Sequence, residues 1–202
     1  MLARLISYWV YGGLLAGILL LVLSPLLVSG WPLPAAAAFL LLPAYMIHQY
    51  EEHDHDRFRL FFNATIGKGF DVLSPVAVFV TNVPVVWGVI ALSLYAAVEI
   101  SLGWALIAVY LVIVNAFVHI IHAIIFRRYN PGLVTAVLVF LPLGIWVLHL
   151  VDSAGAGSVA NHAVGLVVAV AIHAVLLVHV RRKLATMQRA HEDVVASNSR
   201  HP

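Results

Sequence analysis

The sequence contains no cysteine. Disulfide bonds are therefore excluded, and so are zinc fingers and every other metal site built from thiolate ligands. Cysteine content also gives no indication of whether the protein lies in an oxidising or a reducing compartment. A metal site in this chain has to be built from imidazole and oxygen ligands.

Charged residues are also scarce. They make up 10% of the 202 residues, against 63% hydrophobic residues, and this apolar share is far above that of a soluble domain. The formal net charge is only +2, which gives no argument for a nucleic-acid partner. No glycine-rich phosphate loop and no nucleotide or haem motif stands out. The composition predicts an integral membrane protein that does not bind nucleic acid.

Six apolar segments of membrane-spanning length follow one another along the chain. They occupy residues 8–29, 33–52, 72–98, 102–126, 133–151 and 161–180. Basic residues fall in every second connection, and by the positive-inside rule this places both termini in the cytoplasm. We therefore predict an all-α bundle of six transmembrane helices over residues 1–184, in the plasma or inner membrane, followed by a polar cytoplasmic tail at 185–202.

Histidine is unusually frequent, with 11 in the chain, and packing in a membrane protein gives no reason for so many. His48, Glu51 and Glu52 lie at positions i, i+3 and i+4 at the end of the second predicted helix, so their side chains leave from one face. Imidazole and carboxylate ligands together suit iron, zinc or manganese better than calcium or magnesium. Pro43, shortly before His48, predicts a kink close to this group.

Two other predicted helices carry histidine at the same depth. His48, His119 and His173 lie eight or nine residues before the basic residue that ends each helix, and so about 12–14 Å inside the cytoplasmic boundary. Glu52 and His122 form a second layer nearer the water. Ionisable groups inside a bilayer are costly and normally face the bundle interior beside a partner. The two layers predict a metal or proton-transfer site; the alternative is a polar network that only fixes helix packing.

Two more polar motifs lie further along the chain. An N-x-x-x-H-x-x-H pattern begins at Asn115, and Y-N-P-G begins at Tyr129. With the H-x-x-E-E signature that begins at His48, these motifs resemble the HXXEE-domain family of small bacterial and archaeal membrane proteins. The resemblance extends from the second predicted helix to the fifth or sixth. It implies an enzyme whose site lies at these polar motifs, and it implies no particular substrate.

The first functional hypothesis is a membrane metalloenzyme that acts on a lipid-like substrate from the cytoplasmic leaflet. The expected ligands to one or two divalent transition metal ions are His48, Glu51, Glu52, His119, His122 and His173. So many ligands favour a pair of irons and hydroxylase-like or desaturase-like redox chemistry, which would need an electron-donating partner. The lack of a repeated multi-histidine box favours a zinc hydrolase instead.

The two glutamates are expected to differ in role. Glu52 shares its depth with His122 and is the better metal ligand, whereas Glu51 lies deeper and is the candidate general base. Asn115 is a candidate catalytic residue, since it could contact the substrate or orient a ligand, and Asn82 is a candidate for the same positioning role.

Two other hypotheses use the same residues. A metal or proton transporter would employ them as a relay, but it needs a polar path to the outer surface, for which only His149 and His162 are candidates. A structural or sensor protein would use the cluster for assembly and would have no cavity at the cytoplasmic end. His53 and His55 are further candidate ligands, since Glu52-x-x-His55 has the spacing of half of a di-iron motif, but they belong to a charged run, HDHDR, which is more typical of a solvated loop.

Overall fold

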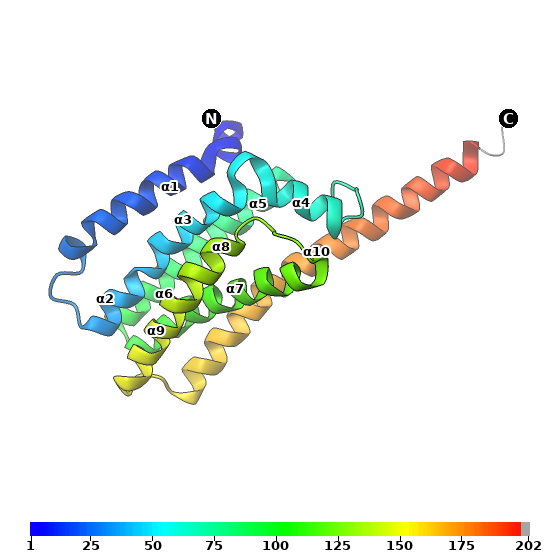
Figure 1. Ribbon diagram of the computed structural model, residues 1–202. Coiled ribbons are helices and arrows are strands. Elements are labelled where there is room, and N and C mark those ends of the chain that lie inside the picture. Colours follow the sequence, from blue (N-terminus) through cyan, green and yellow to red (C-terminus); the bar gives the residue numbers. More distant parts are fainter. Residues whose placement is uncertain (199–202) are drawn as a thin grey trace.

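The computed structural model describes residues 1–198 and is an all-helical bundle (Figure 1). Within these residues, five helical stretches are long and apolar enough to cross a membrane. They are α1 (Leu2–Leu27); α5 (Pro75–Val80) with η2 (Thr81–Trp87) and α6 (Gly88–Glu99); η3 (Leu102–Ala105) with α7 (Leu106–Phe126); α8 (Leu133–Thr135) with η4 (Ala136–Phe140) and α9 (Leu141–Ser153); and α10 (Val159–Asn198). The predicted class, a membrane helix bundle, is confirmed.

The second predicted span is divided into two helices. α2 (Leu33–Phe39) and α3 (Leu41–His53) meet at Leu40. Pro43 has no backbone N–H to donate to the carbonyl one turn earlier, so the ladder of helical hydrogen bonds is interrupted where the sequence predicts a kink. Neither helix alone is long enough to count as a span, and six membrane crossings therefore stay a prediction.

Proline also shapes the walls of the bundle next to α3. η2 and η4 are π-helical segments; η2 contains Pro84, and Pro142 follows η4. A proline leaves an earlier carbonyl without its usual partner, and a wider helical turn accommodates this. η2 carries Asn82 and η4 carries Phe140, and both residues lie at the candidate site described below.

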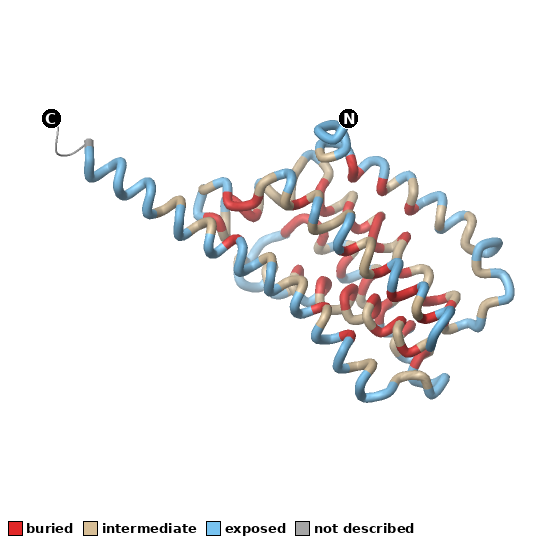
Figure 2. The backbone as a smooth tube through the Cα atoms, turned by 180° about the vertical axis from the view of Figure 1, so that it is seen from behind, coloured by how far each residue is buried: buried red, intermediate tan, exposed pale blue. Residues whose placement is uncertain are grey.

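Close approach between α1 and α3 depends on a glycine. A Cβ atom at Gly17 would lie 2.9 Å from Cβ of Met46 and 3.1 Å from the carbonyl oxygen of Pro43, so only glycine lets the two helices pack this tightly. The main hydrophobic core lies on the other side of α3, where it packs with α6, α7 and α9. Figure 2 shows the buried residues concentrated inside the bundle.

The charged segment that follows α3 is not the loop that the sequence predicts. It forms η1 (Asp54–Asp56) and a further helix, α4 (Arg57–Thr65). Phe58 and Phe62 lie one turn apart on the inner face of α4, and Phe62 is buried. This helix is amphipathic and short, so it leaves no long apolar run in the sequence.

The predicted polar tail is also helical. α10 runs without interruption past residue 184 to Asn198 and has 40 residues. At about 60 Å it is roughly twice as long as the hydrocarbon core of a bilayer is thick. Val180, Leu184 and Met187 of α10 still pack against the hydrophobic cluster beside α4, and only the last turns of the helix project beyond the bundle (Figures 1 and 2). Residues 199–202 of the predicted tail lie outside the described residues.

The absence of cysteine makes the predicted topology directly testable. Ser29, Arg128 and Ser153 are exposed residues in or beside the turns of the bundle. We expect a membrane-impermeant thiol reagent outside sealed right-side-out vesicles to label Ser29→Cys and Ser153→Cys but not Arg128→Cys, because only the last would lie in the cytoplasm. Labelling of all three from one side would contradict the predicted six-span arrangement.

Candidate metal centre

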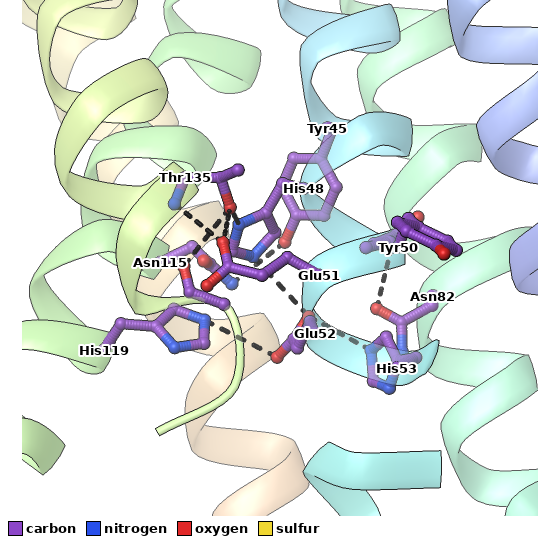
Figure 3. A network of polar contacts seen from close by, with 12 residues as sticks. Tyr45, His48, Tyr50, Glu51, Glu52, His53, Asn82, Asn115, His119 and Thr135 are labelled. Atoms are coloured by element: carbon purple, nitrogen blue, oxygen red, sulfur yellow. Dashed lines mark hydrogen bonds and ion pairs between the residues drawn. The ribbon is translucent and has the colours of Figure 1, made fainter. Parts of the chain in front are cut away.

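Three ionisable side chains converge between α3 and α7 (Figure 3). His48 and Glu52 lie one turn apart on α3, His119 faces them from α7, and all three are buried. One ligand atom from each lies within 4.8 Å of the other two, and in the described part of the chain this is the one group with such geometry. Nε2 of His48 is 3.6 Å from Oε2 of Glu52, and Nε2 of His119 is 3.5 Å from Oε1 of Glu52. The group could hold a metal ion.

The ring orientation of His48 is fixed by a hydrogen bond at Nδ1, the nitrogen that faces away from Glu52. Its Nδ1 lies 2.7 Å from Oγ1 of Thr135, and the Thr135 hydroxyl donates to Oε2 of Glu51 at 2.5 Å. Because that hydroxyl proton is directed to Glu51, its oxygen accepts from His48, which places the imidazole proton on Nδ1. Nε2 is then a free lone pair that has no hydrogen-bond partner among the described residues. This is the tautomer that a metal ligand needs.

His119 is oriented in the same way. Its Nδ1 lies 2.7 Å from Oδ1 of Asn130, and the Asn130 amide donates to the backbone carbonyl of His119 at 2.9 Å. The second bond fixes the amide so that its oxygen faces the ring, and His119 Nδ1 therefore carries the proton. The lone pair of Nε2 is left to face Glu52. Both histidines thus present Nε2 to the same centre.

Glu51 faces away from this centre. Its carboxylate accepts hydrogen bonds from the backbone N–H of Val134 at 3.1 Å and of Thr135 at 2.7 Å, and from the Tyr129 hydroxyl at 2.8 Å. Burial and the bond to Glu51 raise the pKa of Tyr129 to about 12, so this hydroxyl stays a donor at neutral pH. Glu51 is therefore held at Thr135 and does not belong to the converging group, and its predicted roles of metal ligand and general base stay predictions.

Gly132 leaves the space that the two imidazoles occupy. A Cβ atom there would lie 2.6 Å from Cε1 of His119 and 2.9 Å from Cε1 of His48. The backbone φ of Gly132 is +95°, in the left-handed region that favours glycine. Glycine is therefore required at this position for two independent reasons.

A cavity of about 380 Å³ adjoins the three converging residues. Most of its lining is aliphatic or aromatic, and its polar lining residues are Glu52, His53, Thr81, Asn82, Asn115, His119, His122 and His173. His173, predicted in the layer of His48 and His119, and His122, predicted in the layer of Glu52, both line the cavity, but they do not belong to the converging group. His173 instead directs Nδ1 to the carbonyl of Ala169 in its own helix, 2.8 Å away. The structure brings together three of the six predicted ligands.

His53 is a site residue for which the sequence favours a solvated position. It is 6% exposed, and its Nε2 lies 3.0 Å from Oε2 of Glu52. Its ring packs between Trp9 and Phe58, with centroid distances of 5.1 and 5.3 Å. The expectation of a solvated side chain is wrong for His53 because α4 folds over it, and it is right for His55, which lies in η1 and whose side chain is 83% exposed.

Comparison with known proteins adds one finding. A family model described as a protein of unknown function with HXXEE motif matches residues 39–147. The chain belongs to this HXXEE family. The match confirms the resemblance drawn from the sequence motifs, and it includes the three converging residues but not α1 or α10. No curated protein and no solved structure shows significant similarity to the chain.

The geometry gives a physical role to most letters of the HXXEE motif and of the Y-N-P-G loop. In the first motif, His48 and Glu52 face the centre and Glu51 holds Thr135. In residues 129–132, the tyrosine holds Glu51, the asparagine orients His119 and the glycine makes room for both rings. The loop thus positions the side chains of the centre. The Y-N-P-G motif was the one feature of the sequence that pointed to these contacts.

The contribution of the Thr135 hydroxyl to metal affinity should be measurable. We expect Thr135→Val to weaken zinc binding about 10- to 100-fold, as is typical when a group that orients a metal-binding histidine is lost. Competition with a chelating dye in detergent would measure this affinity. Thr186→Val is the matched control, since it removes a hydroxyl that bonds only within the exposed part of α10. Equal affinities of both variants and wild type would show that Thr135 does not orient a ligand.

Proposed function

We propose that this protein is a membrane metalloenzyme whose single metal ion is held by His48, Glu52 and His119. The observation that carries the proposal is the convergence of three ligand atoms within 4.8 Å, with both imidazoles oriented by a hydrogen bond at Nδ1. Two imidazoles and one carboxylate are the donor set of non-haem Fe(II) oxygenases and also of zinc hydrolases. Such sites leave coordination positions free for water or substrate.

The cavity supports a lipid-like substrate. Ligand sites are typically apolar clefts with a few convergent polar groups, and this cavity combines aliphatic and aromatic walls with the polar residues of the centre. Phe58 and Phe62 of α4 line it on the predicted cytoplasmic side and would keep bulk water away from the centre. An apolar chain lying beside the metal ligands favours oxidation of that chain, and iron bound here would supply oxygen activation for it.

A zinc hydrolase is the second candidate. It is favoured by the number of converging ligands, since three suffice for one zinc ion and the predicted second metal has no separate ligand set among the described residues. Two further histidines, His53 and His122, line the same cavity and could move a proton there. Bound zinc would supply activation of water for attack on a substrate carbonyl or ester.

Transport finds less support in the architecture. At the opposite end of the bundle, His162 bonds Tyr110 at 2.9 Å and pairs with Asp152 at 3.0 Å. Between Tyr110 and the centre, the buried face of α7 presents Leu111 and Val112. Within the described residues of α7, this apolar layer interrupts the polar path that a relay would need.

Elemental analysis of the detergent-purified protein tests the proposal. We expect about one equivalent of iron or of zinc per chain, in line with a single three-ligand centre. Iron would select the oxidative candidate and zinc the hydrolytic one. If the protein holds neither metal, even after reconstitution with Fe(II) under anaerobic conditions or with Zn(II), the proposal fails.

A further inference from the structure

Asn115 presents an unpaired acceptor to the cavity beside the metal centre. The residue lies one turn before His119 on the same face of α7 and is 8% exposed. Its amide nitrogen donates to the Tyr45 hydroxyl oxygen at 3.0 Å (Figure 3), while its Oδ1 is buried and has no partner within residues 1–198. A buried acceptor without a partner has lost its hydrogen bonds to water and gained none in return, which is unfavourable. A molecule that brings a donor into the cavity would remove this penalty.

The other asparagine of the cavity is satisfied. Asn82 accepts a hydrogen bond from Gln49 Nε2 at 2.9 Å and donates to the carbonyl of Val78 at 2.9 Å. Gln49 in turn accepts from the Trp87 indole. Asn82 therefore has no need of a ligand, although it lines the same space. Of these two asparagines, Asn115 is therefore the one that can accept a hydrogen bond from a bound molecule.

The cavity reaches the lipid-facing surface. α10 packs along α7 but not closely against α5, and cavity-lining residues come from both α5 and α10. Two of the α10 residues, Val170 and Leu177, are themselves 49% and 39% exposed. At the predicted cytoplasmic end, the buried Phe62, Leu73 and Val180 belong to one hydrophobic cluster that closes the space. The side between α5 and α10 is therefore where a molecule from the surrounding lipid would enter.

We propose that the cavity takes a long-chain molecule with a hydroxyl group, and that this hydroxyl donates a hydrogen bond to Oδ1 of Asn115. The hydrocarbon chain lies along the apolar wall between α5 and α10. Because Asn115 is one turn from His119, the hydroxyl-bearing end lies next to the metal ligands. The assignment of this molecule as the substrate rests on the proposed function, whereas its recognition by Asn115 does not.

A matched pair of probes tests the proposal. One probe is a long-chain alkanol with a photoreactive diazirine in the chain, and the other is its methyl ether, which lacks the donor. With the full-length protein in lipid nanodiscs, we expect the alkanol to label α7 and α10 peptides about tenfold more than the ether, measured by mass spectrometry. Asn115→Leu, which keeps the side-chain shape, should abolish this preference, whereas Asn115→Asp and the control Asn82→Leu should retain it.

Equal labelling of wild type by both probes overturns the proposal, and so does a preference that survives in Asn115→Leu. A loss of bound metal in Asn115→Leu, measured on the same sample, also overturns it, because Oδ1 would then serve a metal-bound water. The retained preference of Asn115→Asp guards against a folding defect as the cause. If wild type prefers the alkanol but binds no metal, recognition by Asn115 is supported and the proposed metalloenzyme is refuted. If wild type binds metal but shows no preference, the metalloenzyme is supported and recognition by Asn115 is refuted.

Discussion

Glu52→Ala should yield a folded protein that binds neither iron nor zinc. Glu52 is the carboxylate that lies between the two imidazoles, at 3.6 Å from Nε2 of His48 and 3.5 Å from Nε2 of His119. Without it, two neutral imidazoles face each other in an apolar setting with no negative charge to balance a divalent ion. We expect metal content to fall from about one equivalent to below the detection limit of elemental analysis, since three protein ligands are the usual minimum for such a site.

The neighbouring glutamate is the matched control. Glu51→Gln keeps the shape of the side chain but turns an NH₂ group towards donors, since the present carboxylate accepts from Val134, Thr135 and Tyr129. The support of His48 is then weakened but its ligand atom is kept. We expect Glu51→Gln to bind metal about 10- to 100-fold more weakly and still to reach full occupancy at excess metal. Full occupancy in Glu52→Ala would refute the ligand assignment, and a total loss in Glu51→Gln would refute the division of roles.

The depth argument explains why His48 and His119 could be predicted to meet. The sequence places a basic residue after each of their helices, Arg127 directly after α7 and Arg57 shortly after the end of α3, and counting from that marker predicts depth at about 1.5 Å per residue. Depth does not give rotation about the helix axis. His173 shares the depth of the other two but lies on α10, where its Nδ1 turns back to Ala169. It reaches the cavity without reaching the centre.

The support of the centre could not be derived from spacing. Thr135 meets Glu51 from 84 positions away, and Tyr129 from 78. Contacts between distant segments leave no periodic signal in a single sequence, and one threonine in a helix or one tyrosine in a loop has many ordinary explanations. The Y-N-P-G motif marked the loop but gave no partner. The burial of His53 was hidden for a related reason, since it depends on α4, a helix too short and too amphipathic to be recognised as apolar.

Gly132→Ala should lose metal binding although it adds only one methyl group. The new Cβ would lie 2.6 Å from Cε1 and 3.0 Å from Nε2 of His119, and 2.9 Å from Cε1 of His48, so both rings must move. Neither ring is free to do so without breaking its hydrogen bond to Asn130 or Thr135. Since a displacement of about 1 Å is enough to spoil a functional site, we expect zinc affinity to fall by at least about a hundredfold.

Gly69→Ala separates this clash from backbone strain. Gly69 has φ +88°, close to the +95° of Gly132, but a Cβ atom there would meet nothing within 4 Å. Both variants should therefore lose a similar amount of stability, about 1–2 kcal/mol for alanine in the left-handed region, measured as the free energy of unfolding. Only Gly132→Ala should lose metal affinity as well. If the two variants bind zinc alike, glycine is needed at position 132 only for the backbone conformation of the turn. The imidazoles then do not bind a metal ion at the place that the three converging residues define.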